Sequence, residues 1–269
     1  MGIRSGSQVS LPLNRTQPNR ELAIAESLGA REKKMSFKRK PPVGNVRLVH
    51  SSSTSLRGVL TNKAGHIVQF ESWLERSLLL RLDRDPRVKD YGSQPEVFRF
   101  VDGDGRDHTY VPDFIVWRSN GAIEIHEVST SHHQTREDAQ RRMEAACEIC
   151  RARGWHYLVH DEKDLPQGSE LANLLALYAY RPSIYADDTV NQLALKQLSG
   201  KARVSLQFLI NDITQTSQLS HSIVLAGLCH LLWHSTYGIT TDLNELVFLF
   251  GSVNPAARVW LEPSERSAL

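Results

Sequence analysis

The pattern of apolar and polar positions divides the chain into three parts. Residues 1–50 show no sustained apolar period and only one weak helical segment, residues 20–34. Residues 51–166 alternate strand-like and helix-like patterns, and residues 167–269 become helical and rich in leucine. We therefore expect a basic, largely disordered arm followed by two folded domains.

The middle part predicts a mixed α/β domain. Ser72 is a typical N-cap for the first helix, and Asp102-Gly103-Asp104-Gly105 is a strong turn signal between two strands. The expected elements are a hairpin over residues 58–62 and 66–70, a helix over 73–83, strands over 97–101, 108–116 and 124–128, a helix over 135–153 and a strand over 155–160. This order gives a sheet with helices before and after its central strands.

The last part predicts a mainly helical domain. Its expected helices cover residues 170–180, 189–198, 205–213 and 220–233, and they precede a wing-like strand at 237–240 and the segment 242–250. A winged-helix module and a generic helical bundle both fit this pattern, because the sequence does not fix the angles between the helices.

Two carboxylates stand where neighbouring strands can bring them together. Asp113 follows Pro112 at the entry to one apolar strand, and Glu127 lies near the end of the next strand. Period-2 alternation places Glu127 and Ser129 on one face of that strand, opposite His126. Asp113 and Glu127 are therefore expected to converge.

Hydrolysis of a phosphodiester with a metal ion requires such carboxylates, because they hold the cation that activates the attacking water. A third carboxylate can come from the preceding helix, where Glu71 and Glu75 lie four residues apart. We favour Glu75, which lies one turn inside the helix.

This layout is similar to the Pro-Asp…Glu-x-Lys pattern of restriction-endonuclease-like nucleases. Further segments extend the likeness, and they are Phe70-Glu71-Ser72-Trp73-Leu74-Glu75, Asp85-Pro86-Arg87-Val88, Gln94-Pro95, Tyr110-Val111-Pro112-Asp113-Phe114 and Glu127-Val128. No single motif is decisive, but their order and spacing are specific. With these segments, residues 55–165 resemble the TnsA family of heteromeric-transposase endonucleases.

The resemblance implies a restriction-endonuclease-like core that cuts the 5′ strand at transposon ends. It implies Mg²⁺, with Mn²⁺ as a substitute, held by Glu75, Asp113 and Glu127 with help from the backbone carbonyl of Val128. It also implies DNA, a DDE-type transposase and an AAA+ ATPase regulator as partners.

The chain departs from the family pattern at Ser129, which stands where the pattern has lysine. Lysine orients the attacking water and offsets charge on the phosphoryl oxygens, and a serine hydroxyl brings no such charge. Another residue can replace it, with His132, His133, Arg136 and Gln94 as candidates. Otherwise the protein is a slow nuclease or a subunit that no longer cuts. A stand-alone nuclease that needs no transposase is a further alternative.

Charge is unevenly placed along the chain. Residues 1–50 hold ten Lys or Arg and three Glu, a net +7, whereas the whole chain has a net charge of +2. The remainder is therefore acidic, at about −5. The basic arm suits a phosphate backbone, and a solvated tail explains its composition equally well; Met35 is an alternative start to Met1.

Other candidate sites have simpler explanations. Cys147 and Cys150 have zinc-type spacing without a second ligand pair, so we expect two core cysteines. His230 and His234 are expected to be ordinary core and surface residues, and Asp187-Asp188 to cap a helix. An odd number of cysteines and no membrane span suggest a cytoplasmic protein with reduced thiols.

Overall fold

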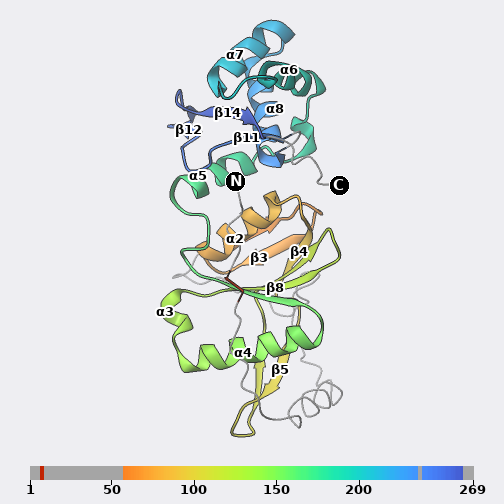
Figure 1. Ribbon diagram of the computed structural model, residues 1–269, viewed down its shortest axis with the longest axis vertical. Helices are drawn as coiled ribbons and strands as arrows, with labels where there is room; N and C mark the ends of the chain where they lie inside the picture. Colours follow the sequence, from red (N-terminus) through yellow and green to blue (C-terminus); the bar gives the residue numbers. More distant parts are fainter. Residues whose placement is uncertain (1–6, 9–56, 236–237, 263–269) are drawn as a thin grey trace. The chain divides into compact units, whose positions relative to one another are not determined.

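A computed structural model describes residues 7–8, 57–235 and 238–262 (Figure 1). The chain divides between Leu165 and Pro166 into two compact units, and each has its own core. We call them unit 1 and unit 2. Apart from residues 7–8, the basic arm and the helix expected over residues 20–34 lie outside the described residues.

The centre of unit 1 is a five-stranded mixed sheet with the order β1-β9-β8-β7-β4. Its strands are β1 (Ser7–Gln8), β4 (Val88–Ser93), β7 (Phe114–Arg118), β8 (Ile123–Val128) and β9 (His156–His160). β8 and β9 run parallel, and the other neighbours run antiparallel. A helix connects β8 to β9, as a parallel crossover requires.

Two hairpins complete the strands of unit 1. β2 (Gly58–Thr61) pairs with β3 (Ile67–Phe70), and β5 (Phe98–Val101) pairs with β6 (Asp107–Tyr110). The helices of unit 1 are α2 (Trp73–Arg84), α3 (Ser131–Gln134) and α4 (Glu137–Ala152). The N-cap of α2 is Ser72, whose hydroxyl accepts from the Glu75 backbone N–H, as the sequence predicts.

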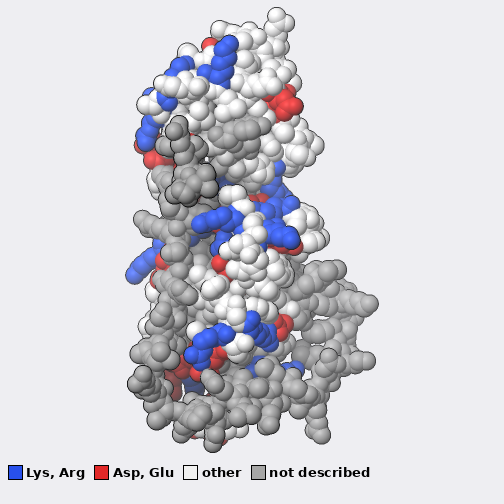
Figure 2. Space-filling model, turned by 45° about the vertical axis from the view of Figure 1, so that its right-hand side comes forward, with Lys and Arg blue, Asp and Glu red and all other residues white. Residues whose placement is uncertain are grey.

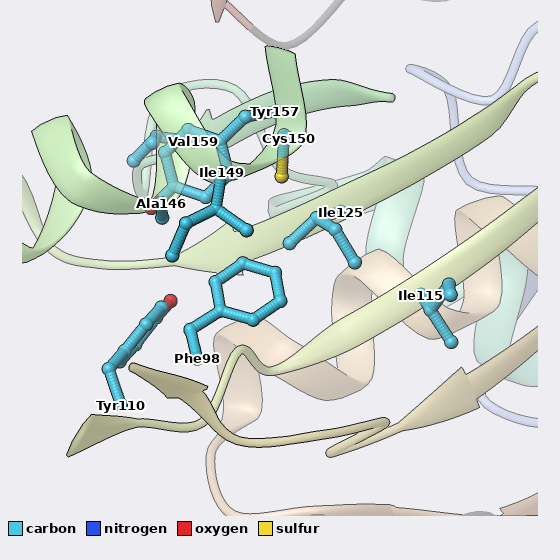
Figure 3. Packing of buried hydrophobic residues seen from close by; sticks show 9 residues of the cluster. All are labelled: Phe98, Tyr110, Ile115, Ile125, Ala146, Ile149, Cys150, Tyr157 and Val159. Carbon is cyan, nitrogen blue, oxygen red and sulfur yellow. The ribbon is translucent and has the colours of Figure 1, made fainter. Parts of the chain in front are cut away.

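One face of the sheet packs against α4. Figure 3 shows the buried cluster that they form with the β5–β6 hairpin. Its members are Phe98, Tyr110, Ile115, Ile125, Ala146, Ile149, Cys150, Tyr157 and Val159. Burial of each large apolar side chain contributes roughly 1.5–3 kcal/mol. The core therefore fixes the strands that lie beneath α4.

The opposite face of the sheet lies toward α2. A pocket of ≈ 550 Å³ on this face is lined by Leu78 and Leu82 of α2 and by alternate residues of β8 and β9, among them His126 and His160. Since successive strand residues point to opposite faces, the residues between them point toward α4. Unit 1 thus has helices on both faces of a mixed sheet.

The structure corrects the expected strands at two places. The strand expected over residues 108–116 is two strands, β6 and β7, which belong to different sheets. Pro112 lies between them and has no N–H to donate to a ladder. β4 was not predicted, because its polar residues and its register shift between Val88 and Asp90 hide the alternation.

The helix expected over residues 135–153 is confirmed as α4, and the short helix α3, which was not predicted, precedes it. Thr130 caps the short α3, and Arg136 then has an extended backbone at the N-cap of α4. The chain therefore turns at the end of β8 before it enters the long helix.

Unit 2 combines helices with small sheets, and Figure 1 labels most of its elements. They are α5 (Gly168–Tyr178), η1 (Ser183–Tyr185), α6 (Asp188–Leu198), β10 (Val204–Ser205), α7 (Leu206–Ser217), α8 (His221–His234), β11 (Ile239–Thr241), β12 (Phe248–Leu249), β13 (Ser252–Val253) and β14 (Arg258–Leu261). β10, β14 and β11 form one sheet, and β12 pairs with β13. The winged-helix assignment stays a prediction.

The core of unit 2 is built around α8, which is apolar on most sides. Leu228, Leu231 and Trp233 are almost completely buried. A Cβ added at Gly227 would lie 3.1 Å from a methyl carbon of Val190, so α6 and α8 approach closely there. Within the residues described, no helix has both the length and the apolar character needed to cross a bilayer.

Candidate active site

Asp113 and Glu127 lie directly across from each other at one end of the β7–β8 pair. Phe114 pairs with His126, and one further step of this antiparallel register puts Asp113 opposite Glu127. The Asp113 Oδ2 atom accepts from the Val128 N–H at 2.9 Å, and the Asp113 N–H donates to Glu127 Oε2 at 3.4 Å. The backbone of each strand therefore holds the carboxylate of the other.

Gln94 fixes the backbone that carries Asp113. Its N–H donates to the Asp113 carbonyl at 2.7 Å, and its side-chain Nε2 donates to Glu71 Oε1 at 3.2 Å. Gln94 has a φ of 47°, a left-handed conformation that few residues other than glycine adopt. A buried residue in such a conformation is often found at a functional site.

Glu127 is surrounded by groups that change its acidity. Burial and the negative charge of Glu75 raise its pKa, and hydrogen bonds from the Tyr110 hydroxyl and the Asp113 N–H together with the charge of Arg142 oppose this, so that the pKa is about 7. Burial and the Glu127 charge raise the pKa of Tyr110 well above its usual value. Tyr110 therefore stays neutral and donates to Glu127 Oε2.

Glu75 lies at the start of α2 and caps that helix. Its Oε2 accepts from the Glu71 N–H at 2.7 Å, and its Oε1 accepts from the Ser72 hydroxyl at 3.1 Å. This arrangement is similar to a capping box, but Glu75 accepts from the N–H of Glu71 and not from that of the N-cap residue Ser72. The charge of Glu75 still influences Glu127, although the carboxylate is turned to its own helix terminus.

Among the described residues, no cluster of three or more His, Cys, Asp or Glu side chains is close enough to hold a metal ion. The structure thus brings Asp113 and Glu127 together and leaves Glu75 beside them. Val128 contributes its N–H to Asp113.

Ser129, at the motif-lysine position, contacts a histidine. Its hydroxyl lies 3.1 Å from Nδ1 of His133 on α3. The other candidates for a replacement differ in their surroundings: His132 is exposed, and the exposed Arg136 donates to Asp138 at 3.1 Å.

Sequence reasoning missed two residues of the site, Tyr110 and Arg142. Tyr110 reads as an ordinary strand aromatic in the pattern, and Arg142 as one of many charged residues on an amphipathic helix. The available signal for Tyr110 was its place in the matching segment Tyr110-Val111-Pro112-Asp113-Phe114, two residues before Pro112.

The donor set fits a hard divalent cation. Mg²⁺ prefers oxygen ligands and is typically held by one or two carboxylates together with water and substrate phosphate. Asp113 and Glu127 offer two such carboxylates. A cation there would also relieve the repulsion between Glu127 and Glu75 that helps to raise the Glu127 pKa.

The cysteines and the α8 histidines have structural roles. Cys150 is buried in the core of unit 1, and Cys147 packs against it, as expected. Nδ1 of His230 lies 2.9 Å from the Tyr180 carbonyl, and Nε2 of His234 lies 2.8 Å from the Arg181 carbonyl. These contacts tie α8 to the segment after α5.

Comparison with protein families identifies the central part of unit 1. Residues 85–162 match the model for the TnsA-like endonuclease N-terminal domain. The matched range contains Asp113, Glu127 and Ser129 and begins after Glu75. A search of curated proteins found no match. The mixed α/β core of unit 1 is restriction-endonuclease-like, as the resemblance implied, and the match supports a nuclease role in transposition.

Proposed function

Since residues 85–162 match a TnsA-like endonuclease domain, we propose that this protein is a Mg²⁺-dependent DNA endonuclease subunit that cuts the 5′ strand at transposon ends. The observation that supports this most directly is the pairing of Asp113 and Glu127 across β7 and β8. These two carboxylates stand at the positions that the resemblance assigns to metal ligands.

In this proposal the two carboxylates hold the cation, with Glu75 and the Val128 carbonyl as the further ligands that the resemblance implies. When bound, Mg²⁺ lowers the pKa of the attacking water and offsets charge on the phosphoryl oxygens. Tyr110 holds Glu127 Oε2, and the Val128 N–H holds Asp113 Oδ2. Both carboxylates are therefore oriented before the substrate arrives.

The proposed partners are those that the resemblance to the TnsA family implies. A cut of the 5′ strand alone leaves the 3′ strand for a second enzyme, and we propose a DDE-type transposase for that step and an AAA+ ATPase as its regulator. We place the reaction in the cytoplasm, which suits the free thiols of Cys147, Cys150 and Cys229.

A second candidate is a TnsA-like subunit that no longer cuts and has a structural or targeting role. Two observations favour it. Ser129 replaces the lysine, and the Glu75 carboxylate is engaged as a helix cap. Under this alternative, unit 1 binds DNA or partner subunits without hydrolysis.

The experiment is strand-specific nicking of end-labelled transposon-end DNA with Mg²⁺ or Mn²⁺, in the presence of the proposed DDE-type transposase partner. We expect cleavage of the 5′ strand by the wild type and none by Asp113→Asn, which keeps an acceptor for the Val128 N–H. Asp104→Asn, in the exposed β5–β6 turn, is the matched control and should cut normally. No cutting by the wild type, with binding to DNA or transposase intact, would favour the second candidate.

A further inference from the structure

The end of β8 is held in place from several sides at Ser129. Its N–H donates to the His160 carbonyl of β9 at 3.0 Å, and its carbonyl accepts from Gln134 Nε2 at 2.7 Å. The first bond continues the parallel pairing of β8 with β9 for one more residue. Ser129 is therefore fixed relative to the sheet and to α3.

The turn that follows Ser129 is anchored as well. The Ser131 N–H donates to the Glu162 carboxylate at 2.9 Å, and the Ser131 hydroxyl donates to the same carboxylate. Thr130 caps α3 by accepting from the His133 N–H at 3.3 Å. These bonds fix the backbone of the turn and of the first residues of α3, from which the His133 side chain extends.

His133 stands beside the position that the motif reserves for lysine. Alternation along β8 puts Ser129 on the same face as Glu127, so a lysine at residue 129 would extend its side chain past this face. The serine side chain is too short to fill the space that a lysine would take, and its hydroxyl lies 3.1 Å from His133 Nδ1. His133 is partly buried, whereas its neighbour His132 is exposed.

The other side chains considered for this role are engaged elsewhere. Gln94 Nε2 donates to Glu71, and Arg136 donates to Asp138. The charge of Arg142 reaches Glu127, but the Arg142 side chain is 40% exposed and lies 3.7 Å from the Asp138 carboxylate. His133 alone among them contacts the residue that replaces lysine.

We infer that His133, held by Ser129, takes the place of the motif lysine and positions the attacking water; this inference rests on the proposed nuclease function. With Nδ1–H donating to the Ser129 hydroxyl, Nε2 can accept a proton. The water oxygen then forms a bond to phosphorus, the bond from phosphorus to the leaving sugar oxygen breaks, and that oxygen takes a proton from solvent. The water proton passes to Nε2 and then to solvent.

The test compares His133→Gln with the matched control His132→Gln in the nicking assay. We expect His133→Gln to lower the cleavage rate about 100-fold, which is the lower end of the range for loss of a general base. Its affinity for DNA, measured with Ca²⁺ in place of Mg²⁺, should be unchanged. His132→Gln should cut like the wild type. Adding Ser129→Lys to His133→Gln should restore cleavage at least tenfold, because lysine then occupies its usual position.

A second readout does not depend on cleavage. In proton NMR spectra, a small amount of Mn²⁺ bound at Asp113 and Glu127 should broaden the imidazole signals of His133. The signals of His132 should broaden less. The signals are assigned with the two glutamine variants, and Asp113→Asn should abolish the effect. Equal broadening of both histidines would overturn the proposed position of His133.

The outcomes separate the two proposals. A wild type that cuts, an inactive Asp113→Asn and a fully active His133→Gln would overturn the inference and leave the nuclease function standing. A wild type that does not cut would overturn the nuclease function and the inference with it. Failure of Ser129→Lys to rescue His133→Gln would show that His133 does not replace the lysine.

Discussion

At the scale of single residues, Glu127 combines two properties that oppose each other. It lies among apolar and acidic groups that favour its protonated form, and it accepts hydrogen bonds that favour its ionised form. The balance puts its pKa at about 7, well above the usual value of a glutamate. Without a cation, ionisation of Glu127 therefore costs more free energy in the folded protein than in the unfolded chain.

This cost predicts a pH dependence of stability in the metal-free protein. Between pH 4.5 and about 7 the folded state keeps a proton on Glu127 that the unfolded state has lost. The contribution of protonated Glu127 to the free energy of unfolding is therefore complete at low pH and is lost as the pH rises through 7. Relative to Glu127→Gln, the wild type should lose roughly 3 kcal/mol between pH 4.5 and pH 8.

Urea unfolding in EDTA at the two pH values measures this loss. Glu148→Gln, at an exposed position of α4, is the matched control and should follow the wild type. Identical pH profiles for the wild type and Glu127→Gln would show that Glu127 titrates normally.

Sequence reasoning found Asp113 and Glu127 because both follow from local rules, a proline before a strand and alternation along the next. It could not find the Tyr110 hydrogen bond, because that contact depends on how the β5–β6 hairpin folds over the end of β8. Nor could it show that the Glu75 carboxylate turns to cap α2, since Ser72-x-x-Glu75 fits both roles.

At the scale of elements, the parallel pair β8–β9 is held by a polar chain on the face opposite the candidate site. Glu124 Oε2 lies 2.8 Å from His126 Nε2, and His126 Nδ1 lies 2.8 Å from His160 Nε2. The two imidazole rings are stacked and buried. Burial and the neighbouring His126 lower the pKa of His160 to about 3.

This polar chain of Glu124, His126 and His160 predicts that acid destabilises unit 1. Below pH 6.5 the unfolded state takes up a proton at His160, and the folded state does so only near pH 3. The contribution of neutral His160 to the free energy of unfolding is therefore complete above pH 6.5 and is lost as the pH falls. At pH 5 the loss from His160 is about 2 kcal/mol.

Chemical denaturation at pH 7.5 and pH 5 tests this effect with His160→Gln and with His156→Gln, an exposed residue of the same strand. The first variant should lose less stability than the wild type on acidification, and the second should match the wild type. Equal losses in all three proteins would exclude His160 as the source.

The elements that the sequence predicted well are those with a strong period of their own. The β2–β3 hairpin and α2, α5, α6, α7 and α8 lie close to their expected ranges. β4 was missed because its place at the edge of the sheet, beside β7, comes from pairing and not from its own pattern. The division of β6 from β7 depends likewise on which partner each segment finds.

At the scale of the whole molecule, basic residues are concentrated in the first 50 positions of the sequence. On the face drawn in Figure 2, the Lys and Arg side chains of the described residues lie in separate groups, with Asp and Glu side chains near them. Residues 1–50, in contrast, have a net charge of +7 and include the run Lys38-Arg39-Lys40. If DNA is the substrate, this segment is the strongest electrostatic contact that the chain offers.

Neutralising Lys38, Arg39 and Lys40 together to glutamine should weaken DNA binding and make it less dependent on salt. Each phosphate contact that is lost lowers the slope of log affinity against log salt by about 0.9, so three contacts lower it by up to about 3. Titrations between 50 and 200 mM salt measure this slope. The matched control neutralises Lys89, Arg99 and Arg106, which are exposed on unit 1. Both variants lose the same net charge, so an equal change of slope would mean that the DNA affinity depends on the overall charge of the protein. A change of slope confined to the first variant would assign the phosphate contacts to the arm.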